Sequence, residues 1–284
     1  MKNTDQSQTF LFDDTAIRGQ IIHLNQSYLD VVDKKNYPTK IRHMLGEFLA
    51  SVTALSSTLK FEGSLILQAK SQGQVRLIMA ECKNREFVRA ICHFDENFDE
   101  DKPLFEQGNL ALTLEPLKGK PYQSLIALHE DNIAKGIEEY YLQSEQIKTS
   151  FKIAVNDNQA SAMMIQAMPL FANNSSLQIE DESYNRVSYL FSTLKDKEIL
   201  ELPNQEILYR LFHEETVRVY DPKDLSFKCG CSRKRCENAV INLGLEDAKL
   251  LIQEQGKISV DCQFCNQHYS FKDSDLAEIF QPPH

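Results

Sequence analysis

Hydrophobic and polar positions change their period several times along the first half of the chain. Apolar residues recur every three or four positions over 39–60, which predicts a long helix with a wide buried face. Over 63–115 they alternate with polar neighbours, which predicts successive strands of an antiparallel sheet. Helical spacing returns over 132–146, and a hairpin is predicted over 151–168.

These patterns make residues 9–177 one α+β domain, in which helices pack on an antiparallel sheet. A strand or a hairpin is expected within 10–22 and a short helix over 28–32. The polar stretch 1–8 is predicted to be a disordered tail, and the turn-forming residues 173–176 mark the end of the domain.

After this domain, the apolar residues form several short stripes with helical spacing. Interrupted helical stripes run from Val187 to Phe212, and the segment 178–226 contains 11 acidic and 6 basic residues. Helices this short cannot enclose a core of their own, so we expect them to lie on another surface. Residues 178–226 are interpreted as an amphipathic helical linker, and the pattern alone favours an ordinary connector.

The last segment, 227–284, is predicted to be a small separate module. Its pattern indicates a helix over 245–255 that stops at Gly256, a strand at Ile258 and Val260, a returning strand over 269–271, and a final helix over 274–280. So short a segment buries too little apolar surface to fold alone, so it requires another source of stability.

Cysteines supply that source. Five of the seven cysteines fall in this last segment, and four of them form two close pairs, Cys229 with Cys231 and Cys262 with Cys265. Two such pairs are typical of a tetrahedral zinc site, and structural zinc supplies an apparent ~10–16 kcal/mol of folding free energy. We predict one Zn²⁺ per chain on these four cysteines. Cys236 and His268 are competing ligands, and the basic residues 233–235 lie beside the site in the sequence, where they offset the charge of four thiolates.

Composition narrows the function classes. The formal net charge of −10 and the nearly balanced charges of 227–284 disfavour nucleic acid as a partner. No apolar run approaches the ~20 residues of a membrane span, so we expect a cytoplasmic protein whose cysteines are thiols or metal ligands. Cys82 and Cys92 lie among strand-like apolar residues and are interpreted as small core residues.

Three functions are compatible with such a module: a zinc ribbon that binds RNA or the translation machinery, a redox switch, and an oxidoreductase. Paired cysteines beside cations favour a thiolate that oxidants attack, which suits the switch. An oxidoreductase requires one dithiol free of metal, whereas each pair here is predicted to share one, so we do not expect an enzyme.

The residues 202–236 (LPNQEILYRLFHEETVRVYDPKDLSFKCGCSRKRC), with Cys262-Gln263-Phe264-Cys265-Asn266 and Tyr269-Ser270-Phe271, closely resemble the heat shock protein 33 family of redox-regulated bacterial chaperones. Leu45-Gly46-Glu47 and Leu59-Lys60-Phe61-Glu62-Gly63 resemble motifs of its N-terminal domain. The resemblance extends over nearly the whole chain.

The resemblance implies a holdase that works without ATP, is inactive when reduced and zinc-bound, and forms a homodimer when active. Oxidation by peroxide under unfolding conditions, or by hypochlorous acid, is implied to form the disulfides Cys229–Cys231 and Cys262–Cys265 and to release zinc. The linker 178–226 is then implied to lose order and to uncover an apolar surface that binds unfolding client proteins. The resemblance thus reverses the interpretation of this segment as an ordinary connector.

Overall fold

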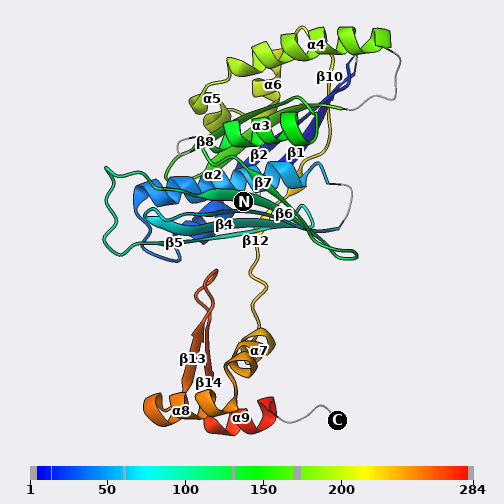
Figure 1. Ribbon diagram of the computed structural model, residues 1–284. Coiled ribbons are helices and arrows are strands. Elements are labelled where there is room, and N and C mark those ends of the chain that lie inside the picture. The colour runs from blue at the N-terminus through cyan, green and yellow to red at the C-terminus, as the bar shows by residue number, and fades with distance from the viewer. Residues whose placement is uncertain (1–4, 14, 60–61, 130–131, 169–173, 281–284) are drawn as a thin grey trace. The chain divides into compact units, whose positions relative to one another are not determined.

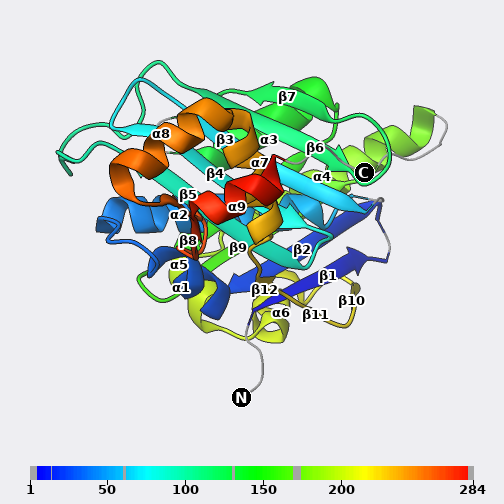
Figure 2. The ribbon, with the colours of Figure 1, turned by 90° about the horizontal axis from the view of Figure 1, so that it is seen from below.

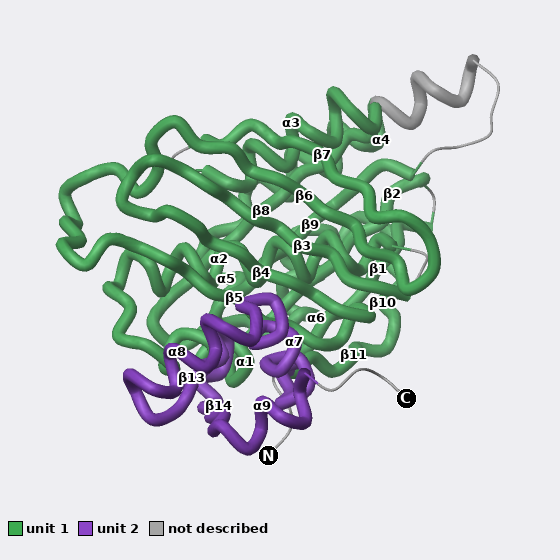
Figure 3. The backbone as a smooth tube through the Cα atoms, turned by 60° about the horizontal axis from the view of Figure 1, so that its bottom comes forward, with its two compact units in different colours: residues 1–227 green, residues 228–284 purple. Residues whose placement is uncertain are grey.

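The computed structural model describes residues 5–13, 15–59, 62–129, 132–168 and 174–280, without the side chains of 174–181. The chain divides into two compact units, Met1–Phe227 and Lys228–His284 (Figure 3). Within the described residues, no helix combines the length and the apolar character needed to cross a membrane.

In the part of the chain that the structure describes, the first unit is built on two six-stranded sheets (Figure 1). The first sheet has the order β10-β1-β2-β9-β8, and β11 also pairs with β1. Its strands are β1 (Gln6–Phe12), β2 (Ile17–Leu24), β8 (Thr149–Val155), β9 (Ala160–Ala167), β10 (Val217–Val219) and β11 (Lys223–Asp224). The β8–β9 pair is antiparallel, so the hairpin predicted over 151–168 is confirmed, and the antiparallel β1–β2 pair shows that the strand or hairpin expected within 10–22 is a hairpin.

The second sheet has the order β12-β5-β4-β3-β6-β7. Its strands are β3 (Gly63–Lys70), β4 (Val75–Lys83), β5 (Phe87–Phe94), β6 (Asn109–Pro116), β7 (Tyr122–Ile126) and β12 (Ser226–Phe227). Neighbours from β5 to β7 pair antiparallel, as the alternating pattern over 63–115 predicted, whereas β12 runs parallel to β5.

The long helix α2 (Thr39–Ser56) packs between the two sheets, with α1 (Gln26–Val32) and α3 (Ile133–Ser144) nearby. The helix was predicted with one buried face, but it is buried on nearly all sides. Small residues such as Ala50, Ser51 and Ala54 explain the difference, because they allow close packing on sides that carry no large apolar residue.

Three helices of the predicted linker cover the other face of the first sheet. They are α4 (Asn174–Ser192), α5 (Asp196–Glu201) and α6 (Asn204–Phe212). Their buried residues, among them Val187, Phe191 and Phe212, form one cluster with Phe10 and Phe12 of β1. The expectation that these helices lie on another surface is therefore confirmed, and they belong to the first compact unit.

Three details predicted for residues 1–226 are wrong. Gln6, Ser7 and Gln8 are not in a disordered tail but in β1, because pairing with β2 satisfies their backbone groups despite polar side chains. Residues 174–176 are not a break but the first turn of α4, whereas 173 lies outside the described residues. The linker is not wholly helical, since 217–227 forms β10, β11 and β12 on the edges of the sheets.

The second unit contains α7 (Arg233–Leu243), α8 (Leu245–Gln255), β13 (Ile258–Asp261), β14 (His268–Phe271) and α9 (Asp273–Ile279). Gly256 ends α8 in the left-handed conformation (φ 76°), as predicted. Helix α7 was not predicted, because only Cys236 and Val240 of its residues are buried, too few to produce a stripe. Six buried residues form the core of this unit: Cys236, Val240, Ala248, Ile258, Phe271 and Leu276.

Candidate metal centre

The structure brings the two cysteine pairs of the second unit together. The Sγ atoms of Cys229, Cys231, Cys262 and Cys265 all lie within 4.8 Å of one another, and each residue is partly buried. The sulfurs of Cys229 and Cys262 are 3.4 Å apart, as are those of Cys231 and Cys265. Four sulfurs at about 2.3 Å from a central Zn²⁺ would be about 3.8 Å apart, so the donor set fits a tetrahedral metal ion.

The second pair is positioned by the turn that joins β13 to β14. Their register ends at the pair Asp261 and His268, directly before Cys262. The backbone N–H of Asn266 donates to the C=O of Cys262 (2.9 Å), and Asn266 adopts the left-handed conformation that asparagine tolerates (φ 57°). The tight turn therefore directs Cys262 and Cys265 to the same point.

The first pair lies in the loop between β12 and α7, and it is held by the residues that follow. Ser232 caps α7 by accepting a hydrogen bond from the backbone N–H of Arg235. The Arg235 guanidinium in turn donates to the C=O of Gly230 (2.7 Å), between the two cysteines. The loop conformation that brings Cys229 and Cys231 together is thus fixed from the helix.

The basic residues 233–235 offset the negative charge of the four cysteine sulfurs less than their position in the sequence indicates. Arg233 pairs with Asp275 (2.8 Å) and stacks on the Phe271 ring, 4.5 Å from its centroid. Lys234 is exposed and lies 3.4 Å from Glu237. These two cations are therefore matched by carboxylates of the same unit, and Arg235 acts through the loop backbone.

The pKa values of Cys229, Cys262 and Cys265 are shifted in different directions. Burial raises the pKa of the Cys229 and Cys265 thiols. Burial acts in the same direction on Cys262, but backbone hydrogen bonds from Cys265 and Phe264, together with side-chain hydrogen bonds from Cys229 and Cys265, outweigh it and lower its pKa to about 7. A lowered pKa favours the thiolate, the form that binds metals and reacts with oxidants.

Tyr269 also belongs to the site, although the sequence indicated it only as part of a strand and of a family motif. Its hydroxyl donates to the Cys231 sulfur (3.2 Å), and this hydrogen bond raises the tyrosine pKa to about 12. The available signal was its position two residues before Phe271 in β14, which places both side chains on the same face of the strand, with Tyr269 nearer the turn that carries Cys262 and Cys265.

The remaining cysteines and the competing histidine lie outside the cluster. Cys236 is buried in the core of the second unit, and the ring of His268 lies 2.7 Å from the Asp261 carboxylate. Cys82 and Cys92 are buried in the first unit, where burial raises their pKa to about 11 and about 12. These two thiols are therefore poor nucleophiles, in agreement with their interpretation as core residues.

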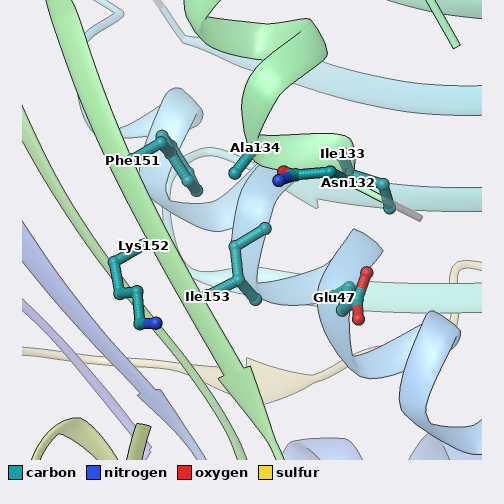
Figure 4. Close-up of a pocket in the computed structure, with 7 residues that line it drawn as sticks. All are labelled: Glu47, Asn132, Ile133, Ala134, Phe151, Lys152 and Ile153. Atoms are coloured by element: carbon teal, nitrogen blue, oxygen red, sulfur yellow. The ribbon is translucent and has the colours of Figure 1, made fainter. Parts of the chain in front are cut away.

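A separate pocket of about 210 Å³ lies in the first unit, beside α2, α3 and β8 (Figure 4). Its charged lining groups are Glu47 and Lys152, and Lys152 also pairs with Asp196 of α5 (2.5 Å). This ion pair ties the sheet to a linker helix, which is a structural role.

The whole chain is similar to known chaperones. Residues 5–272 match the family model described as Hsp33 protein. A 33 kDa chaperonin of Pseudomonas aeruginosa strain LESB58 is 42% identical over 285 residues, which cover 99% of this chain and 96% of that protein. One of Pseudomonas savastanoi is 40% identical over 285 residues, with coverage of 99% and 95%. The solved structure of a 33 kDa chaperonin from Thermotoga maritima matches with a TM-score of 0.82 at 20% identity, covering 97% of each chain, which shows the same fold.

Proposed function

The chain belongs to the Hsp33 family of chaperones, and on that premise we propose that it is a redox-regulated holdase that works without ATP. The clients are unfolding proteins, and the active form is a homodimer in the cytoplasm. The reduced, metal-bound chain is the resting form, and oxidation of the cysteine cluster is the activating event.

One observation carries this proposal: an apolar sheet face is covered by a segment that leads directly into the cysteine cluster. Phe10, Phe12 and Ile21 of the first sheet are fully or almost fully buried beneath α4–α6. The same segment ends in β12, and only Lys228 separates β12 from Cys229. If the loop at Cys229 unfolds, β12 is therefore only one residue away, and the end of the covering segment loses its anchor.

We propose that Cys229, Cys231, Cys262 and Cys265 hold one Zn²⁺. When bound, zinc would keep the four sulfurs as thiolates and supply the folding free energy that the small core of the second unit lacks. Around the site, the hydrogen bond from Tyr269 orients the Cys231 sulfur, and the turn at Asn266 keeps the second pair together.

Oxidation is proposed to form the disulfides Cys229–Cys231 and Cys262–Cys265. In each pair two thiolates lose two electrons and one S–S bond forms, while one hydrogen peroxide takes up these electrons and two protons from the solvent and is reduced to two waters. The pairing rests on the family resemblance, because the two 3.4 Å contacts join the pairs crosswise. Disulfide sulfurs no longer carry the charge that binds a cation, so the second unit loses its main support.

The covering segment is suited to open after that loss. Its residues 178–226 carry a net charge of −5, and many polar side chains of α4–α6 are exposed. Helices α4–α6 bury one apolar side against the sheet and expose the other, so less buried surface opposes their release than opposes opening of the core. Opening would uncover a contiguous apolar face, which is the kind of surface that binds unfolding proteins.

A client-aggregation assay tests the proposal. We expect the reduced, zinc-loaded chain to leave the aggregation of a thermally unfolding reporter enzyme unchanged, and the chain treated with peroxide at elevated temperature to suppress it. A chromophoric zinc indicator should report about one zinc released per chain in the same sample. Equal suppression by both forms would contradict the proposed regulation.

Replacing Tyr269 with phenylalanine is expected to weaken metal binding roughly tenfold, because outer-shell hydrogen bonds to metal ligands typically contribute 10–100-fold in affinity. Competition with a chromophoric chelator measures the change. Tyr209→Phe is the control, since Tyr209 is exposed on α6 and has no part in the site. Unchanged affinity in Tyr269→Phe would show that the hydroxyl does not support the cluster.

A further inference from the structure

The outer edge of β1 is covered over its whole length by the last part of the linker. Strand β10 pairs antiparallel with the second half of β1, and β11 pairs with its first two residues (Figure 2). Three further backbone bonds extend the contact: Leu225 N–H to Asp5 C=O (2.9 Å), Tyr220 N–H to Thr9 C=O (3.0 Å), and Asp13 N–H to Thr216 C=O (3.0 Å). The segment 216–225 thus occupies this edge as an added strand.

This added strand is held mainly by its backbone. Of residues 216–224, only Val217 is partly buried, and all the others are exposed. The ion pair of Arg218 with Asp13 (3.1 Å) is a surface pair, and such pairs contribute little. The strand therefore depends on the folded helices before it and on β12 after it to stay in place.

We propose that the edge of β1, Gln6–Phe12, binds an extended segment of a client protein by strand addition once the linker has opened. This inference rests on the proposed function, and it specifies how the chaperone binds its client. An unfolding protein offers unpaired backbone N–H and C=O groups, and an exposed sheet edge pairs with such groups in a sequence-tolerant way. The linker strand is then the internal occupant that keeps the edge closed in the resting form.

The same geometry indicates a preference among client segments. Val217 packs against the cluster that contains Phe10 and Phe12, whereas Arg218 points to solvent. Alternate side chains of an added strand lie on opposite faces, so an apolar residue at every second position would reach the uncovered apolar face. The occupant is therefore an extended peptide with alternating apolar residues.

Two proline substitutions distinguish loss of a hydrogen bond on β1, where the client would pair, from loss of one on the linker strand. The C=O of Thr9 and the N–H of Asp13 bond to the linker, so alternation directs the Leu11 N–H to the same side. Leu11→Pro removes this donor from the edge while leaving the side that pairs with β2, and proline is tolerated at such edge positions. Tyr220→Pro removes one hydrogen bond of the same contact from the linker strand instead.

After peroxide activation, the affinity of Leu11→Pro for an unfolded reporter enzyme is expected to fall about fivefold to tenfold, as the loss of one hydrogen bond predicts. Tyr220→Pro is expected to bind as tightly as the unchanged chain, because its linker strand has left the edge. Equal binding by Leu11→Pro and the unchanged chain would overturn the inference. Failure of the oxidised unchanged chain to bind any client would instead overturn the proposed function, and this inference with it.

A peptide measurement avoids dependence on the folding of the variants. A fluorescent peptide of residues 215–225 should bind the oxidised, full-length chain and be displaced by the reporter enzyme. Methylation of the Tyr220 nitrogen, which bonds to Thr9, should weaken binding about tenfold. Methylation of the Val219 nitrogen, on the opposite side of the strand, should leave it unchanged. Equal binding by both methylated peptides, or no binding by the unmodified one, would contradict the inference.

Discussion

Replacing Cys265 with alanine is expected to abolish stoichiometric metal binding and to unfold residues 228–280, while the two sheets and α2 of the first unit stay folded. Structural zinc contributes an apparent ~10–16 kcal/mol to folding, which exceeds what the small core of the second unit can replace. With its end unfolded, the covering segment should loosen, and the variant should suppress client aggregation without oxidant. Metal analysis, limited proteolysis and the aggregation assay measure these three effects.

Cys236→Ala is the matched control for this substitution. Cys236 lies in the same unit and is buried, but it is outside the group of four sulfurs. We expect it to retain one metal ion per chain and to remain inactive under reducing conditions. If Cys265→Ala kept its metal, or if both variants lost it equally, the assignment of the four ligands would be wrong.

Replacing Phe212 with alanine is expected to activate the chain without oxidation and without loss of metal. Phe212 is 1% exposed, and its ring centroid lies 5.0 Å from that of Phe12 in an edge-to-face contact. Truncating a buried phenylalanine costs about 3–5 kcal/mol, a large fraction of the ~5–15 kcal/mol that stabilises a typical domain. The loss falls on the contact between α6 and the sheet, so the open linker should become populated.

Tyr209→Ala is the control on the same helix, because Tyr209 is 72% exposed. It should leave both the metal content and the resting inactivity unchanged. Client aggregation under reducing conditions distinguishes the two variants. An inactive, metal-loaded and folded Phe212→Ala would show that the helices do not restrain activity by covering the sheet.

Elements with a strong apolar period were predictable from the sequence, and those held by backbone pairing were not. Helix α2 and strands β3 to β7 of the second sheet follow directly from the spacing of buried side chains. In contrast, β10 and β11 bury almost no side chain, because each adds to an existing edge through its backbone. Helix α7 was missed for a related reason, since its stripe is only two residues long.

The cysteine cluster was predictable because spacing restricts which sulfurs can meet, but its surroundings were not. The hydrogen bond from Tyr269 to Cys231 depends on the register of β13 and β14, which the spacing of cysteines does not determine. The pairing of Arg233 with Asp275 was also not predictable from the sequence, because the two residues lie on α7 and α9 and are 42 positions apart. Long-range pairs of this kind set the charge around a site.

Hydrogen exchange tests the central claim most directly, namely that oxidation of the cysteine cluster opens the segment that covers the first sheet. Amides of 184–225 would be compared in the reduced, metal-loaded chain and in the peroxide-treated chain, with α2 as the internal reference. The account predicts that protection of 184–225, including the Tyr220 amide bonded to Thr9, is lost on oxidation while α2 stays protected. Unchanged protection of 184–225 in an oxidised, metal-free and client-binding chain would contradict it.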